Sequence, residues 1–138
     1  MLLAGELDWD SNTIKVALLM TSHSLGTSGQ EDATVISGIT TPDECNASGY
    51  TAGGVTLTAS APTSNTGSNR GEADATDISW ATLGNGSRQI AGMLIYKDVG
   101  GVWANGIPIA WVEFTSTINP GGSTLTVQWA SGGILQVS

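Results

Sequence analysis

The side chains that most often carry catalysis or bind metals are rare in this chain. It contains one histidine, His23, and one cysteine, Cys45. His23 lies in the stretch MTSHSLG, without a nucleophile motif such as G-x-S-x-G. Zinc sites need several Cys or His ligands, and a single cysteine cannot form an intrachain disulfide. We therefore expect a loop or core histidine, an inert thiol and no zinc.

Asp8, Asp10 and Asn12 recur at every second position, as ligands do in a calcium-binding loop. The glycine and the closing glutamate of an EF-hand are missing from the residues that follow. Asp and Asn side chains also close local rings with backbone amides, so DWDSN is typical of a turn before a strand. We expect this turn, and no metal ion.

Four further carboxylates, Glu72, Asp74, Asp77 and Glu113, raise the question of glycoside hydrolysis, which uses a pair of acids across the scissile bond. Spacing alone does not exclude such a pair. The stretch EADATDISW is more simply explained by acids on the outward face of a strand, where charge keeps sheet edges from associating. We expect no enzyme and no cofactor, because no residue set combines a nucleophile, a base and an orienting partner.

The stretch YTAGGVTLTA places Tyr50, Gly53 and Gly54 just before an alternating apolar strand that contains Leu57. A glycine-rich loop that cradles phosphate leads into a helix, whereas this one leads into a strand. Glycine adopts backbone angles that other residues avoid. The pattern therefore predicts a bulge or sharp corner that feeds the strand, with Tyr50 folded back over it.

Five tryptophans are many for 138 residues, and they divide into two groups. Trp80, Trp111 and Trp129 fall inside apolar strand patterns, so we expect them in the core. Trp9 and Trp103 fall in loop-like stretches, where an exposed indole can anchor a protein interface or stack on a sugar. These two are the candidate recognition residues.

Composition excludes two classes of partner. The net charge is −8, and the four basic residues, Lys15, Arg70, Arg88 and Lys97, are scattered singly, so we expect no nucleic-acid binding. The start, MLLAGELDWD, has no basic segment and no apolar run of signal-peptide length. No run approaches the length needed to cross a bilayer, so we expect no membrane partner and synthesis in the cytoplasm.

Strand patterns dominate the rest of the chain. Apolar and β-branched runs bounded by Gly, Pro and Asn predict strands at 13–20, 55–59, 77–83, 89–99, 107–116, 123–131 and 134–138. The first run is apolar on both faces, so we expect it to be covered on both sides. With no long amphipathic helix, about seven or eight strands predict an all-β fold, an antiparallel jelly-roll-like sandwich or a barrel.

Finer expectations concern how these strands connect. Residues 1–138 are expected to form one domain, with a short N-terminal arm at 1–12 and a variable polar excursion at 21–49 that holds one helical turn or irregular structure. Asn85-Gly86 predicts a hairpin between 77–83 and 89–99. Residues 61–71 are expected to be a surface loop, and 107–116 an interior strand.

Three ordered motifs and two further stretches carry a resemblance to a known family. They are Tyr50-x-Ala52-Gly53-Gly54-x-x-Leu57, Asp77-x-x-Trp80 and the terminal Gly133-Ile134-Leu135, together with DWDSNTIKVALL and MLIYKD. In their order and spacing, from Leu7 to the C-terminus, these elements resemble small virion structural proteins of tailed bacteriophages. The resemblance implies a virion component in which Tyr50, Gly53, Gly54, Leu57, Asp77 and Trp80 form structural motifs.

Among virion components, a small acidic β domain suits capsid decoration. Such a cement protein would sit on the capsid surface at three-fold or quasi-three-fold sites, bind the major capsid protein and form a homotrimer that matches the site. The candidate contacts are Met1, Leu2, Leu3, Trp9 and Trp103. Two alternatives remain open: a tail- or fibre-associated structural protein, and a carbohydrate-binding module that uses exposed tryptophan.

Overall fold

Antiparallel strands make up most of the regular structure. The computed structural model describes residues 7–30 and 32–137, and within these ranges all strand pairings are antiparallel. The predicted all-β fold is confirmed. In this described part the strands are β1 (Ile14–Met20), β2 (Val55–Thr56), β3 (Ala61–Asn65), β4 (Arg70–Asp74), β5 (Ile78–Leu83), β6 (Ile90–Lys97), β7 (Ile107–Ile118), β8 (Ser123–Val127) and β9 (Leu135–Val137), and the short 3-10 helices are η2 (Ile36–Gly38) and η3 (Trp103–Asn105).

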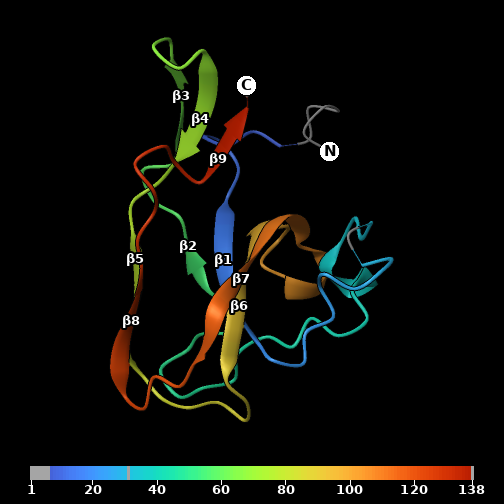
Figure 1. The fold of residues 1–138 in the computed structure, drawn as a ribbon. Helices are drawn as coiled ribbons and strands as arrows, with labels where there is room; N and C mark the ends of the chain where they lie inside the picture. The colour runs from blue at the N-terminus through green and yellow to red at the C-terminus, as the bar shows by residue number, and fades with distance from the viewer. Residues whose placement is uncertain (1–6, 31, 138) are drawn as a thin grey trace.

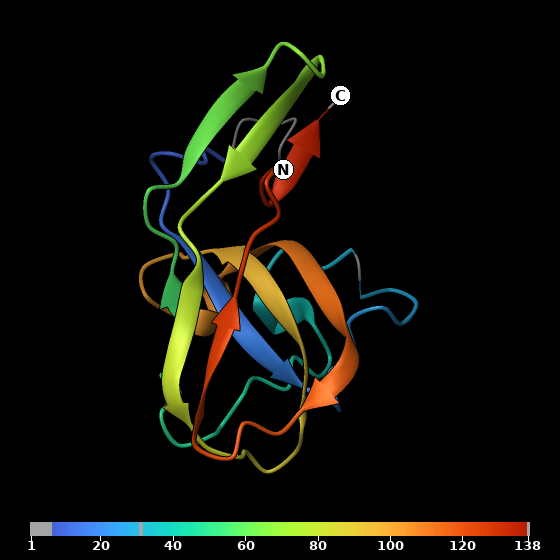
Figure 2. The ribbon, with the colours of Figure 1, turned by 60° about the vertical axis from the view of Figure 1, so that its left-hand side comes forward.

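The strands form three sheets. A four-stranded sheet has the order β2-β1-β6-β7, a two-stranded ribbon joins β5 to β8, and a three-stranded sheet has the order β3-β4-β9. The β5–β8 ribbon stands beside the four-stranded sheet as a second layer (Figure 1). The three-stranded sheet projects beyond both layers (Figure 2). The chain runs from β4 into β5 and from β8 into β9, and β4 pairs with β9 as β5 pairs with β8. The two smaller sheets are therefore parts of one long antiparallel ribbon that is interrupted in the middle.

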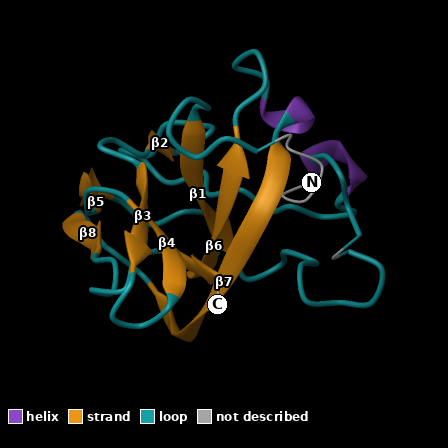
Figure 3. Ribbon diagram, turned by 90° about the horizontal axis from the view of Figure 1, so that it is seen from above, coloured by secondary structure: helices purple, strands orange, loops and turns teal. Residues whose placement is uncertain are grey.

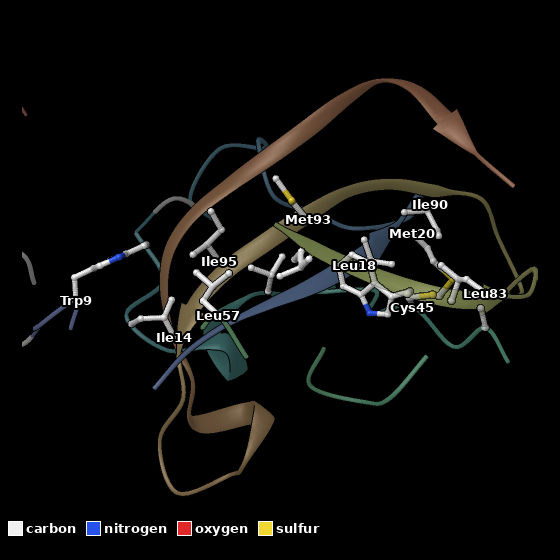
Figure 4. Close-up of a cluster of buried hydrophobic side chains, with 14 residues drawn as sticks. Trp9, Ile14, Leu18, Met20, Cys45, Leu57, Leu83, Ile90, Met93 and Ile95 are labelled. Carbon is white, nitrogen blue, oxygen red and sulfur yellow. The ribbon is translucent and has the colours of Figure 1, made fainter. Parts of the chain in front are cut away.

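Strand β1 is buried on both faces, as its sequence predicts. Every second side chain, from Ile14 to Met20, points into a cluster shared with Trp80 and Leu83 of the β5–β8 ribbon (Figure 4). Ala17 and Leu19 point the opposite way, into a second cluster with residues of β6. Successive side chains of a strand point to opposite faces, so an uninterrupted apolar run requires a cover on each side.

The segment 21–49 supplies the second cover. Its side chains Leu25, Ile36 and Ile39 are buried against Leu94 and Tyr96 of β6. The single helical turn expected in this segment is η2, and the two short helices lie on the side of the four-stranded sheet away from β5 and β8 (Figure 3). The segment is polar on average but contributes apolar residues to the core, and it therefore completes a third layer.

Polar contacts hold this segment together and tie it to β1 and to the residues just before β6. Asp43 accepts a 2.8 Å hydrogen bond from the Ser22 backbone N–H and forms an ion pair with Arg88. The backbone N–H groups of Met20 and Cys45 donate to Asp43 and Leu18 carbonyls across the segment and β1. The thiol of Cys45 is buried.

The glycine pair forms the predicted corner. Gly53 and Gly54 have φ angles of 86° and 72°, which favour glycine. A Cβ at Gly54 would overlap the Val16 carbonyl group. Tyr50 folds back so that its hydroxyl donates a 2.8 Å hydrogen bond to Glu44 Oε1. The strand after the corner, however, is β2 alone: Leu57 is buried as predicted, but 57–59 do not continue the strand.

Two expected connections are wrong. Residues 61–71 were expected to form a loop, yet they contain β3 and the start of β4, which pair from Asn65↔Arg70 to Ala61↔Asp74. Pro62 fits because a strand paired on one side needs fewer backbone donors. The hairpin across Asn85-Gly86 does not form either, because β5 pairs with β8 whereas β6 pairs with β1 and β7. The chain crosses between layers at this turn.

Candidate interaction surface

Strand β7 forms an edge of the four-stranded sheet and carries large exposed apolar side chains. In the described part of the chain it pairs with β6 alone. Trp111 and Val112 are 37% and 41% exposed. The expectations of an interior strand at 107–116 and of a core position for Trp111 are both wrong.

The register explains this exposure. Trp111 lies opposite Leu94, and Val112 lies opposite Met93, so each pair shares one face of the sheet. Leu94 and Met93 are buried beneath the two covering layers. Their partners lie one strand further out, where the cover on each face ends. Alternation along a strand specifies the face of a side chain, but it does not specify whether that face is covered.

Trp111 borders a groove between β7 and the segment 21–49. The groove has a volume of about 390 Å³, and its lining residues are Leu25, Gln30, Ala33, Leu94, Pro108, Ile109, Ala110 and Trp111. The indole rests against the backbone of Gly26, where an added Cβ would lie 3.6 Å from Cζ2. The edge therefore presents an aromatic side chain that is supported from one side and open on another.

Glu113 lies two residues along the same face of β7. Its carboxylate is 3.0 Å from His23 Nε2, and its side chain is 58% exposed, whereas that of His23 is 5% exposed. His23 Nδ1 is buried and has no hydrogen-bond partner in the structure. The histidine is a packed residue, as expected, and Nε2 orients the exposed carboxylate.

The predicted interface residues have different positions. Trp9 is 7% exposed, and its Nε1 donates a 3.1 Å hydrogen bond to the Asp74 carbonyl, so its expected exposure is wrong. It packs in the first cluster because the loop at 8–12 folds against β4. Trp103 begins η3, is half-buried and meets the Tyr96 ring edge-on with centroids 5.0 Å apart. Met1, Leu2 and Leu3 lie outside the described residues.

The other tryptophans and the motif residues have structural contacts. Trp80 is buried as predicted, and Trp129 is half-buried against the same cluster. Asp77 accepts a 2.9 Å hydrogen bond from the Trp129 backbone N–H, and the Trp129 indole donates to the Thr76 carbonyl at 3.2 Å. These bonds join the start of β5 to the end of β8.

The remaining carboxylates are not gathered into one site. Glu72 on β4 accepts a 2.9 Å hydrogen bond from Asn65 and pairs with Arg70 at 2.6 Å, and these hydrogen bonds hold the pKa of Glu72 below its usual range. Glu113 lies in a different sheet. Asp8 and Asn12 close a turn through a 2.9 Å bond from the Asp8 N–H to Asn12 Oδ1. Across 7–30 and 32–137, no three His, Cys, Asp or Glu side chains converge as metal ligands.

Two features of the sequence indicate that 107–116 is an edge strand, although its apolar periodicity does not. Pro108 removes a backbone donor from the run 107–116, and Glu113 places a charge in it. Both are devices by which edge strands avoid unwanted pairing. Glu44 accepts hydrogen bonds from Tyr50 and from the Gly53 backbone, but no local sequence pattern indicates this role.

Within the described ranges, no helix combines the length and the apolar character needed to cross a bilayer. Comparison of the chain with protein-family models, curated proteins and solved structures found no match.

Proposed function

We propose that this protein is a capsid decoration protein of a tailed bacteriophage, which binds the outer capsid and bridges neighbouring major capsid proteins. The motif resemblance suggests a virion component. The observation that carries the proposal further is the exposed apolar edge at β7, where the consecutive residues Trp111 and Val112 are exposed on opposite faces of the strand.

An edge strand with a large exposed aromatic residue is suited to protein contact. Tryptophan is enriched among the residues that dominate interface energies, because its indole buries a large area when a partner covers it. A decoration protein uses these contacts at many identical sites, so a modest affinity per contact is sufficient.

The proposed assembly is a homotrimer at three-fold or quasi-three-fold positions of the capsid. A closed three-fold oligomer presents three copies of the same edge to three equivalent capsid neighbours. The stabilising effect would come from linking subunits that otherwise separate under the pressure of packaged DNA.

The test is binding of the purified protein to expanded capsids that lack it. We expect co-sedimentation that saturates at hundreds of copies per particle, with density at the three-fold positions in a low-resolution reconstruction. Failure to bind such capsids overturns the proposal. Detection of the protein in intact virions at tens of copies or fewer would instead support the tail-associated alternative.

A further inference from the structure

We infer that Trp111 and Glu113 together form a binding site for an arginine side chain of the partner protein. The inference rests on the proposed function, because it specifies the chemistry of the capsid segment that contacts β7. The site lies on the face of β7 that borders the segment 21–49, where both side chains remain partly exposed.

The two side chains are placed for joint recognition. The pairing with β6 is continuous from Leu94↔Trp111 to Gly92↔Glu113, so no bulge separates the two residues. Positions two apart in a strand share a face and lie about 6.6 Å apart. An arginine that stacks on an indole can reach a carboxylate at that distance, because its planar guanidinium carries donors around its edge.

The Glu113 carboxylate is held in position by a histidine and remains open to solvent. His23 Nε2 lies 3.0 Å from one oxygen of Glu113, and more than half of the Glu113 side chain remains exposed. By contrast, Lys15, Arg70 and Arg88 each pair with another carboxylate of this chain. The site therefore presents an oriented, accessible negative charge.

Charge complementarity favours a cationic occupant. The chain has a net charge of −8, so its surface attracts basic segments over a longer range than the contact itself. A purely apolar side chain laid on Trp111 would remove water from Glu113 without replacing its hydrogen bonds, which is unfavourable. A guanidinium covers the indole and supplies those hydrogen bonds.

The adjoining groove accommodates the rest of the arginine. Its walls include Leu25, Ala33 and Leu94, which are aliphatic. The three methylene groups of arginine pack on such surfaces while the charged end reaches a polar partner. The segment bearing the arginine would then run along the open edge of β7.

The inference is tested directly with a small probe on the full chain. The indole N–H signals are recorded by 15N NMR, the Trp111 signal is assigned with Trp111→Phe, and acetyl-Gly-Arg-Gly-amide is titrated. We expect a saturable shift of the Trp111 signal with half-saturation at roughly tens of millimolar peptide, because one exposed stacking contact and one exposed ion pair each contribute little. The matched peptide with citrulline, which is isosteric but uncharged, should shift it far less. Equal shifts with both peptides, or no shift with arginine, overturn the inference.

Two variants extend the test to the proposed partner. Glu113→Gln keeps a hydrogen-bond acceptor for His23 but removes the charge, and it should weaken capsid binding about tenfold and reduce its salt dependence. Trp111→Leu should weaken binding similarly. Val137→Ser, at a 62% exposed position on β9, is the control and should bind as the native chain does. Circular dichroism verifies that each variant is folded.

The outcomes separate the two proposals. If the native chain binds capsids but Glu113→Gln and Trp111→Leu bind equally well, the arginine site is wrong and the proposed function stands. If the native chain does not bind capsids but the arginine peptide shifts Trp111 and the citrulline peptide does not, the proposed function is wrong and the site stands.

Discussion

The Tyr96 hydroxyl donates a 2.7 Å hydrogen bond to the Gly53 carbonyl, although the two residues are 43 positions apart in the chain. On the other side of the same residue, the Gly53 N–H donates to Glu44 Oε1. Tyr96 is fully buried in the second cluster and also meets Trp103 edge-on. The glycine corner is therefore tied both to the central strand β6 and to the segment that covers it.

The first prediction concerns the corner itself. Gly54→Ala should lower the free energy of unfolding by more than about 3 kcal/mol, because it adds a Cβ that overlaps the Val16 carbonyl to the cost of a left-handed backbone. Gly100→Ala is the matched control, with φ of 65° and no atom within 4 Å of the added Cβ. It should cost about 1 kcal/mol. If urea denaturation shows the same loss of stability for Gly54→Ala and Gly100→Ala, the close approach of Gly54 to the Val16 carbonyl has no role.

In an alkaline titration, both tyrosines should ionise together, as the protein unfolds. Burial first, and then the negative charge of Glu44, raise the pKa of Tyr50 above its usual range, and burial with Asp98 raises the pKa of Tyr96. These two are the only tyrosines in the chain. Their contribution to stability is complete below about pH 10, the pKa of an unfolded tyrosine, and decreases as the pH rises above it.

The measurement is absorbance of tyrosinate at alkaline pH beside circular dichroism. Because neither tyrosine ionises readily in the native state, the absorbance should remain flat through about pH 10 and rise only as the β signal is lost. Tyr50→Phe should unfold with a shallower pH dependence. Ionisation of either tyrosine near pH 10 in a chain that stays folded would contradict the buried hydrogen bonds.

Acid stability should depend on Asp43. Burial opposes its ionisation, but hydrogen bonds from Arg88 and from the Ser22 N–H outweigh that effect, so the pKa of Asp43 is lowered. A lowered native pKa gives stability that is complete above about pH 4 and is lost as the pH falls through the native value. Asp43→Asn should cost about 2 kcal/mol at neutral pH, and the difference from the native chain should shrink in acid.

Asparagine suits this position sterically, because Asp43 has a positive φ of 47° that Asn also tolerates. Asp32→Asn, at an exposed position, controls for the loss of one charge and should change stability by no more than about 0.5 kcal/mol. A constant difference between Asp43→Asn and the native chain from pH 2 to pH 7 would refute the ion pair as its source.

Two adjacent core substitutions test the third layer. Leu18→Ala and Leu19→Ala remove side chains with no solvent exposure that point into different clusters. Each should lower the free energy of unfolding by about 2–5 kcal/mol. A much smaller loss for Leu19→Ala would mean that the segment 21–49 is a loose cover. Val137→Ala, at an exposed position, should change stability by less than about 0.5 kcal/mol.

Local patterns were sufficient for the strand character of most of the fold. The unbroken apolar run at 13–20 predicted a strand covered on both faces, and β1 is one. The pair Gly53-Gly54 predicted a corner because few other residues adopt such backbone angles, and both glycines have positive φ. These properties depend on residues close together in the chain, so the sequence alone determined them.

Strand partners and exposure were decided only by the tertiary structure. Residues 77–83 and 89–99 flank a turn-forming Asn-Gly, yet β5 pairs with β8 because its Trp80 and Leu83 face β1 across the core. Trp9 is buried because β4 passes over its loop. Trp111 is exposed because, in the described part of the chain, no strand pairs with the outer edge of β7. The position of a residue along a strand determines the face to which its side chain points. Its burial depends on whether distant segments of the chain cover that face.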